Sequence, residues 1–257
     1  MIGLLGISLC PAAGEGVAQC GTGQAAVEIV EAVDGHSLRL ADGRILRLAR
    51  IIAPLPIDND PSASARAKAS LAEIAAGKSA ILYLASDAPD RYGRWQAGAV
   101  LIEGKQWLEA ALLERGMVRV FSSANDKCMT ALLAHERKAR EARRGIWNEP
   151  QFRIFQADEL ALLLAASGRF AIVEGTVTRV GRGRGRIYLD FGRRFTEDFT
   201  IIVPDSLRKR LEAAGEDPQN WRGKRIRVRG NLFFWGGPAM EINLVQAIER
   251  LENPASE

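Results

Sequence analysis

The fold of the first half of the chain is decided by residues 47–55, which read RLARIIAPL. Three shorter segments accompany this stretch: 34–37 (DGHS), 90–94 (DRYGR) and 142–147 (ARRGIW). Asp-Gly pairs at 34–35 and 42–43 separate apolar, partly alternating runs. Because Asp-Gly is a preferred hairpin turn, the runs 26–33, 37–40 and 44–52 are predicted to be consecutive antiparallel strands.

The order and spacing of these four segments resemble the staphylococcal nuclease-like (thermonuclease, TNase-like) family over roughly residues 27–150. The resemblance implies a five-stranded Greek-key barrel that hydrolyses DNA or RNA phosphodiesters with calcium. Helical spacing and glycine stops place three helices in this half, at 62–76, 107–115 and 129–144. We therefore expect a mainly β protein with helices (α+β), beginning with a nuclease-like barrel.

The family's functional positions carry a mixed set of residues here. Laid onto this chain, the calcium-binding carboxylates fall at His36 and Ile52, and the general base falls at Leu55. Calcium takes about six to eight oxygen ligands, which none of these side chains supplies. The phosphate-contacting arginines fall at Arg47 and Arg94 and are present. Since an arginine fork matches a phosphate bidentately, we expect anion binding without efficient cleavage, with no catalytic residue assigned and no cofactor.

In a second interpretation, the protein is an enzyme with a rebuilt metal site. Asp34, Asp58 and Asp60 lie close to the family positions in sequence and are possible substitute ligands for a rebuilt calcium site. The chain would then be a divergent metal-dependent phosphodiesterase. Asp58 and Asp60 also suit a solvated loop before a helix, and Arg47 and Arg94 each suit a structural role when taken singly. Enzymatic activity is therefore left open by the sequence.

The second half of the chain is predicted to form a barrel of the same type as the first. Alternating apolar patterns and turn residues predict three strands, a helix and two strands, at 169–180, 186–191, 198–203, 206–214, 224–235 and 239–248. This is the order of an oligonucleotide/oligosaccharide-binding (OB) barrel. We therefore expect two tandem OB-type five-stranded Greek-key barrels. A membrane span is not predicted, because no apolar run is long enough to cross a bilayer as a helix.

The basic charge is concentrated in the second half. Residues 169–250 hold 16 Lys and Arg against 10 Asp and Glu, a net charge of +6, whereas the rest of the chain carries −2. Two sets of arginines recur at every second position: Arg182, Arg184 and Arg186, and Arg225, Arg227 and Arg229. With aromatic residues nearby, these six are predicted to bind nucleic acid or another polyanion, as basic grooves with stacking platforms do. The alternative is an outer face of solvated charges around an aromatic core.

The N-terminal residues resemble a secretory signal peptide, with an apolar run and small residues before a cleavage site near Ala18. The alternative is a disordered cytosolic N-terminus. Removing Cys10 with the signal leaves Cys20 and Cys128, a pair suited to a disulfide in an oxidising, secreted or periplasmic compartment. The predicted organisation is a signal peptide, a nuclease-like barrel, a helical linker, a second barrel and a tail, at 1–18, 24–150, 151–168, 169–251 and 252–257.

Three functions are compatible with this sequence. The first is an exported nuclease-derived protein that binds nucleic acid without efficient cleavage, and the second is the divergent phosphodiesterase. The third is a periplasmic module that interacts with a protein or a glycan, in which the arginines are surface charge. The sequence does not discriminate DNA from RNA and does not indicate an oligomeric state.

Overall fold

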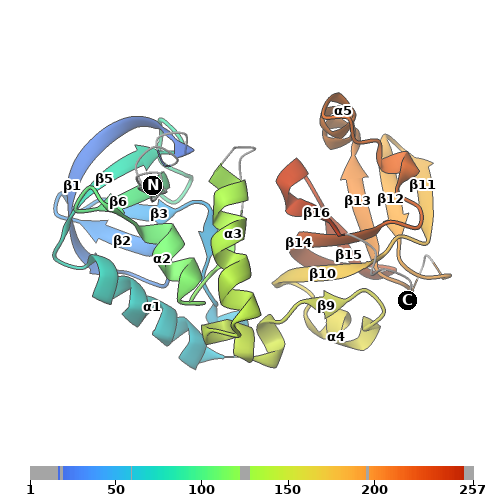
Figure 1. Cartoon of the computed structure of the whole chain (residues 1–257), viewed down its shortest axis with the longest axis horizontal. Coiled ribbons are helices and arrows are strands. Elements are labelled where there is room, and N and C mark those ends of the chain that lie inside the picture. Colours follow the sequence, from blue (N-terminus) through green and yellow to red (C-terminus); the bar gives the residue numbers. More distant parts are fainter. Residues whose placement is uncertain (1–16, 18–19, 59, 122–127, 195–196, 252–257) are drawn as a thin grey trace, which may run out of the picture.

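The computed structural model describes residues 17, 20–58, 60–121, 128–194 and 197–251. It is a mixed α+β protein in which two β-barrels lie side by side, with one long helix between them (Figure 1). The predicted fold class is therefore confirmed. Within the described residues, no helix is both long enough and apolar enough to cross a membrane.

The first barrel is a closed five-stranded sheet whose strands follow the predicted Asp-Gly meander. Its strands are β1 (Thr22–Ala32), β2 (Ser37–Leu40), β3 (Ile45–Leu48), β5 (Ser79–Leu84) and β6 (Trp95–Ile102). The order is β3-β2-β1-β5-β6, and a parallel pairing of β3 with β6 closes the barrel. Two additions stand at its edge: β7 (Gln106–Trp107) continues from β6, and β4 (Ile51–Ile52) pairs with β8 (Arg119–Val120).

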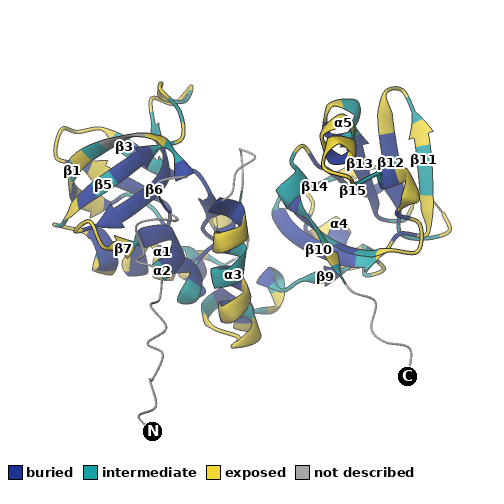
Figure 2. Cartoon of the chain, turned by 45° about the horizontal axis from the view of Figure 1, so that its top comes forward, coloured by how far each residue is buried: buried dark blue, intermediate teal, exposed yellow. Residues whose placement is uncertain are grey.

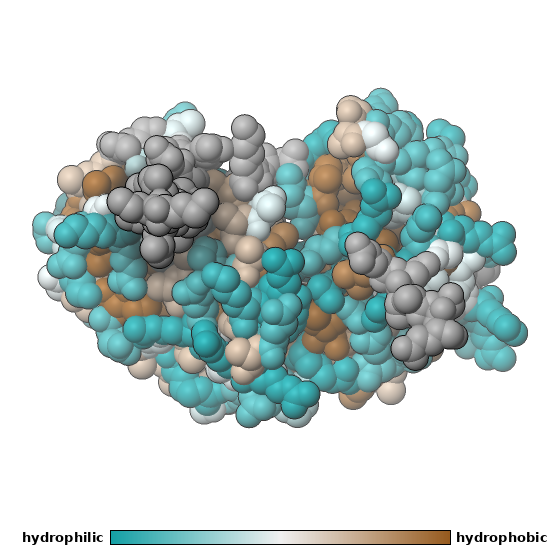
Figure 3. Space-filling model, in the orientation of Figure 1, coloured by the Kyte–Doolittle hydropathy of each residue, from teal (hydrophilic) through white to brown (hydrophobic). Residues whose placement is uncertain are grey.

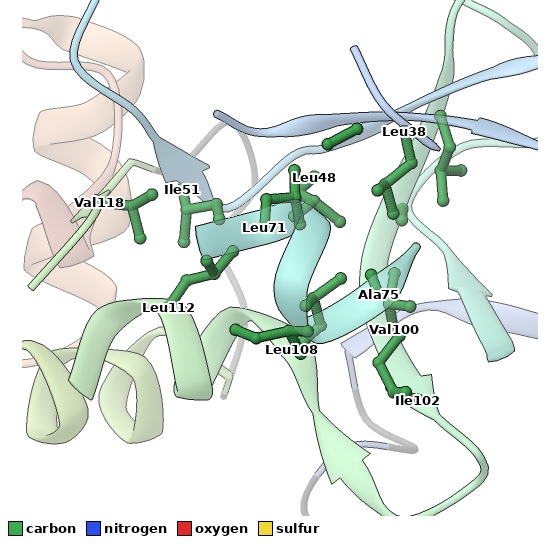
Figure 4. Packing of buried hydrophobic residues seen from close by; sticks show 14 of the residues in the cluster. Leu38, Leu48, Ile51, Leu71, Ala75, Val100, Ile102, Leu108, Leu112 and Val118 are labelled. Atoms are coloured by element: carbon green, nitrogen blue, oxygen red, sulfur yellow. The ribbon is translucent and has the colours of Figure 1, made fainter. Parts of the chain in front are cut away.

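Three helices cover this barrel: α1 (Pro61–Ala75), α2 (Leu108–Glu114) and α3 (Cys128–Glu141). The first begins where the Asp60 carboxylate accepts a hydrogen bond from the Ala63 backbone N–H, with a proline at the start of the helix. Leu71 of α1 lies beside the barrel residue Leu48, and Leu108 and Leu112 of α2 belong to the same buried cluster (Figure 4). The helix predicted at 62–76 is therefore confirmed, and its buried residues, which include Leu71, face the core.

A disulfide joins Cys20, just before β1, to Cys128 at the start of α3. The two residues lie 108 positions apart, and their Cα atoms are 5.5 Å apart. The predicted pairing is confirmed. Gly98 is required beside it, since a Cβ there would lie 1.9 Å from the Cys20 carbonyl oxygen.

The segment between the barrels is partly sheet. It contains the turns η3 (Gly145–Asn148) and η4 (Pro150–Phe152), strand β9 (Phe155–Gln156) and helix α4 (Leu160–Ala165). The helix was predicted within the linker 151–168, but the strand was not. Because β9 pairs in parallel with the first strand of the second sheet, this segment is bonded to the second barrel.

The second barrel has the predicted order of three strands, a helix and two strands, with two runs divided. Its elements are β10 (Phe170–Thr176), β11 (Arg179–Gly183), β12 (Arg186–Asp190), β13 (Thr200–Pro204), α5 (Asp205–Ala213), β14 (Arg225–Trp235), β15 (Gly237–Glu241) and β16 (Ile248–Leu251). The sheet order is β11-β12-β13-β15-β14-β10-β9. β11 stands at one end of this order and β10 near the other, and the chain passes from β10 directly into β11 through Val177 and Thr178. This connection brings the two ends of the sheet together and closes the barrel. The remaining short elements are η2 (Pro56–Asp58), η5 (Pro218–Asn220) and η6 (Val245–Ala247).

Each barrel has its own buried interior, visible as dark blue strands in Figure 2. A third apolar cluster lies between them. It combines Ile52 of β4 and Ala139 of α3 with Trp147, and with Phe170 and Ile172 of β10. Hydrophilic residues cover most of the face shown in Figure 3, with smaller apolar areas over both domains. The two domains are thus joined by a hydrophobic core of their own.

Candidate functional site

Arg47 lies at the seam that closes the first barrel. On β3 it is opposite Ser37 of β2 on one side and Gln96 of β6 on the other. Its guanidinium is half-buried and, among the described residues, makes no hydrogen bond or ion pair. Burial lowers the pKa of Arg47, and the neighbouring charge of Arg94 lowers it further. The two arginines are therefore close enough to repel one another.

Arg94 is oriented by the turn that precedes β6. The Asp90 carboxylate accepts hydrogen bonds from the backbone N–H groups of Tyr92 and Arg94 at 2.9 and 3.0 Å. The same carboxylate accepts from Nε of Arg94 at 2.9 Å, and the guanidinium lies 4.9 Å from the centre of the Tyr92 ring. Gly93 supplies the positive φ of 75° that the turn requires. Arg94 is thus held in place, with part of its charge balanced.

His36 is near both arginines and is only 2% exposed. Its backbone N–H donates to Asp34 Oδ1 at 2.8 Å, and its ring Nδ1 lies 3.4 Å from the same oxygen. Neither ring nitrogen has a hydrogen-bond partner among the described residues. Burial lowers the pKa of His36 to about 4, assisted by the charge of Arg47 and opposed by Asp34. The imidazole is therefore neutral at pH 7.

The other two family positions have different surroundings. Ile52 is 8% exposed and belongs to the apolar cluster between the domains. Leu55 is 38% exposed in the loop after β4, and its backbone N–H donates to Asp58 Oδ2 at 2.7 Å. Neither side chain carries an atom that can bind a cation or take up a proton.

The three carboxylates considered as substitutes each accept hydrogen bonds from nearby groups of the protein. Asp34 accepts from the His36 backbone, and Asp58 accepts from the Leu55 backbone. Asp60 accepts from the Ser62 hydroxyl, the Ala63 backbone and the Gln151 side chain, and these hydrogen bonds at Ser62 and Ala63 help to lower its pKa to about 2. Within the described part of the chain, no group of three or more His, Cys, Asp and Glu residues could hold a metal ion.

A second candidate site lies on the outer surface of the second barrel. Tyr188 of β12 and Trp235 of β14 stack with ring centres 5.4 Å apart and planes within 9°. They line a hollow of about 270 Å³ together with Arg179, Gly181, Arg182, Gly183, Arg184 and Asp190. Trp235 is 49% exposed. The hollow therefore offers an accessible aromatic surface between guanidinium groups, which we name the platform.

The arginines of the β11–β12 hairpin reach this platform. Arg184 and Gly185 form a two-residue loop in which both have positive φ, 51° and 71°, as a type I′ hairpin turn requires. Arg182 and Arg184 are exposed and make no ion pair with a described residue, whereas Arg186 lies 3.6 Å from Glu241. Arg179, which the sequence did not single out, lies 3.3 Å from Asp190. Two of the three predicted arginines are therefore at the platform and unpaired.

The prediction for Arg225, Arg227 and Arg229 needs a correction. They share one face of β14, as their spacing predicts, but that face is turned toward carboxylates. Arg225 and Arg227 bind the two oxygens of Glu174 at 2.7 and 2.8 Å. Arg229 is 4% exposed and binds both oxygens of Glu136 in α3 at 3.0 Å, and Glu249 at 2.7 Å. These guanidiniums join parts of the protein, and they leave little charge for a polyanion.

Arg229 is the centre of this junction between the domains. Its guanidinium also donates to the Val120 carbonyl at 3.2 Å, and Arg119 of the first domain donates to the Phe170 carbonyl of the second at 3.1 Å. Burial opposes the charge of Arg229, but Glu136 and Glu249 outweigh it and raise its pKa. A fully buried charge with three close partners is fixed in position.

A closed five-stranded barrel with paired arginines at its seam defines a nuclease-type OB domain. Residues 46–149 match the sequence model of the family described as staphylococcal nuclease homologue. The first domain is therefore a staphylococcal nuclease-like domain, as its sequence resemblance predicts. The match ends before the second barrel, whose fold rests on its strand order alone. No curated protein matches the chain.

Proposed function

We propose that this nuclease-family protein binds single-stranded nucleic acid and does not cleave it with calcium. The observation that carries the proposal is the Tyr188–Trp235 stack, which is exposed between Arg179, Arg182 and Arg184. Every nucleobase has a face that can stack on such a ring, and each stacked base contributes about 1 to 3 kcal/mol. Guanidinium groups beside the rings suit the phosphates between bases.

The first barrel contributes a second anion site in this proposal. The Arg47 guanidinium has no ionic partner among the described residues, and Arg94 is held close to it. Burial is the main cause of the lowered pKa of Arg47, and a phosphate between the two arginines would offset the further lowering that the charge of Arg94 adds.

The family's calcium ion does not fit the residues present. A hard cation needs about six to eight oxygens, but the family positions offer an imidazole, an isoleucine and a leucine. The oxygens of Asp34, Asp58 and Asp60 face separate backbone and side-chain donors instead of a common point. We therefore derive no metal-dependent step, and we assign no general base.

We also propose that the protein is exported. The Cys20–Cys128 disulfide supports this, because structural disulfides persist mainly in oxidising compartments. The predicted signal segment at 1–18 lies outside the described residues apart from Val17. Labelling of free thiols in protein from its native source tests the proposal, which fails if both cysteines are labelled.

Removing the platform rings is expected to weaken oligonucleotide binding. Tyr188→Ala and Trp235→Ala should each raise the Kd of a fluorescent single-stranded oligonucleotide by about 5-fold to about 150-fold, the equivalent of one stacked base. Fluorescence anisotropy measures this. Phe234→Ala is the matched control, since Phe234 is 66% exposed on the same strand but alternation turns it away from the platform. Equal affinities for all three variants and the parent protein would contradict the proposal.

No metal-dependent turnover is expected. Incubation of labelled DNA and RNA with calcium, magnesium, manganese or a chelator should leave the substrates intact, because the family's metal and base positions carry His36, Ile52 and Leu55 and the described residues hold no cluster suited to a metal ion. Arg47→Ala and Arg94→Ala should each weaken binding and lower the salt slope of log K by about 0.7, the value for one lost single-strand phosphate contact. Metal-dependent hydrolysis that Arg94→Ala abolishes would establish the divergent phosphodiesterase instead. Absence of binding, or binding independent of salt, favours the protein- or glycan-interaction module.

A further inference from the structure

A second hollow lies next to the platform. It has a volume of about 620 Å³ and is lined by Thr178, Arg179, Val180, Gly192, Arg193, Gln219 and Arg222. Three of its seven lining residues are arginines, and none is acidic. Arg193 and Arg222 are exposed and make no hydrogen bond or ion pair with any residue in the described ranges. The hollow is therefore a concave, positively charged surface, which we name the arginine basin.

The basin is assembled where β10 runs into β11. The Thr178 backbone N–H donates to the Asp190 carbonyl at 2.8 Å, and its hydroxyl donates to the Gly192 carbonyl at 2.7 Å. On the other side, the Gly223 N–H donates to the Val177 carbonyl at 2.8 Å. These bonds bring the loops of Arg193 and Arg222 to the start of β11, where Arg179 lies. Three separate segments therefore place their arginines around one depression.

Nearby carboxylates are already engaged with other groups. Asp198 accepts from the Arg194 backbone N–H at 2.5 Å, and Glu197 lies 3.2 Å from the Arg194 guanidinium. Asp217 accepts from the Gln219 backbone N–H at 2.9 Å. Among the described residues, Asp190 is the acid that forms an ion pair with a basin arginine, 3.3 Å from Arg179. Glu197 and Asp190 thus pair with Arg194 and Arg179, whereas Arg193 and Arg222 form no ion pair with a described residue.

The loop geometry keeps this arrangement in place. Gly192 lets the Asp198 carboxylate lie against the backbone, since a Cβ at Gly192 would fall 2.0 Å from it. Before Arg222, Pro218 and Trp221 are buried and fix the loop to the barrel. The two unpaired arginines are therefore carried by loops with anchored backbones, which reduces the ordering cost of binding an anion.

We propose that the arginine basin binds the phosphodiester backbone of the single strand whose bases stack on the platform. Arg179 lines both hollows, so a strand that leaves Tyr188 and Trp235 passes Arg179 and reaches Arg193 and Arg222. This inference rests on the proposed function and extends it. It assigns to the bound strand a path that extends beyond the platform. It also assigns Arg193 and Arg222 as contacts to the phosphodiester backbone outside the platform.

The test uses ligand length. Oligothymidylates from about 4 to about 16 nucleotides, the range of OB-fold site sizes, are titrated against the full chain, Arg193→Ala/Arg222→Ala, and the control Lys68→Ala/Arg137→Ala. The control removes the same charge from exposed positions on α1 and α3. We expect the basin variant to bind the shortest ligands like the parent protein. For the longest ligands, the basin variant should bind about 25-fold more weakly than the parent protein at about 0.1 M salt. Its slope of log K against log salt should be smaller by about 1.4. Both values correspond to the loss of two single-strand phosphate contacts.

Each outcome decides one point. The proposed function itself fails if the parent protein binds no oligonucleotide of any length. With parent binding intact, the basin is excluded as a backbone site by equal affinities of the basin and control variants at every length. The basin is also excluded as a backbone site if the basin variant loses the same factor of affinity for the shortest and the longest oligonucleotides. Thermal unfolding of the basin variant should match that of the parent protein, because both arginines are exposed and make no hydrogen bond or ion pair with a described residue.

Discussion

Glu136→Ala is expected to lower the free energy of unfolding by about 3 to 5 kcal/mol, the cost of removing one partner from a buried ion pair. Glu136 has no exposed surface, and both of its oxygens bind Arg229 at 3.0 Å. One oxygen also accepts from the Val120 backbone N–H at 2.6 Å. The substitution leaves the Arg229 charge and a backbone donor without their main partner. Denaturant unfolding followed by circular dichroism measures the effect.

Two further variants test whether the loss of stability in Glu136→Ala comes from the broken ion pair. Glu141→Ala, at an exposed position on the same helix, should change the free energy of unfolding by no more than about 0.5 kcal/mol. Glu136→Leu/Arg229→Met removes both charges, so it should destabilise the protein less than Glu136→Ala alone. If Glu136→Ala unfolds at the same denaturant concentration as Glu141→Ala, the ion pair does not join the domains as described.

Cys20→Ala/Cys128→Ala is expected to remove up to about 4 to 5 kcal/mol, the chain-entropy contribution of a disulfide that closes a loop of about 100 residues. The bridge ties the strand that begins the first barrel to the helix between the barrels. Replacing both residues avoids leaving a single reactive thiol in the interior, where Cys20 and Cys128 are 0% and 2% exposed.

Reductant supplies the control for this second result. Dithiothreitol should lower the denaturation midpoint of the parent protein toward that of Cys20→Ala/Cys128→Ala and leave the midpoint of the variant unchanged. A parent protein whose midpoint is insensitive to reductant, although its thiols become accessible to labelling, would show that the bridge contributes no stability.

The local parts of the fold could be predicted from the sequence because their causes are local. Asp-Gly turns at 34–35 and 42–43 delimit the strands around them, and Gly77 and Gly116 mark where helices end. The disulfide followed from the even number of cysteines that remained. The break between β10 and β11 was not predicted, because it is set by hydrogen bonds of Val177 and Thr178 to distant loops.

The positions of Arg47 and Arg94 followed from the resemblance to the nuclease family, as did the residues at the family's metal and base positions. The structure places the two arginines near each other, and their role in anion binding stays a prediction. Arg229 was misassigned because a two-residue period shows which side chains share a face, not what covers that face. Its partner Glu136 lies 93 positions away. Similarly, the Tyr188–Trp235 stack joins two strands that are not neighbours in the sequence.

The junction between the barrels has a consequence for how such a chain can evolve. Separated from the first domain, the second would expose Phe170 and Ile172 and would leave Arg229 without Glu136. Recombination near residue 150 would therefore yield two damaged halves instead of two exchangeable units. We therefore expect the two domains to be exchanged only together, and a substitution on one side of the junction to require a compatible residue on the other side.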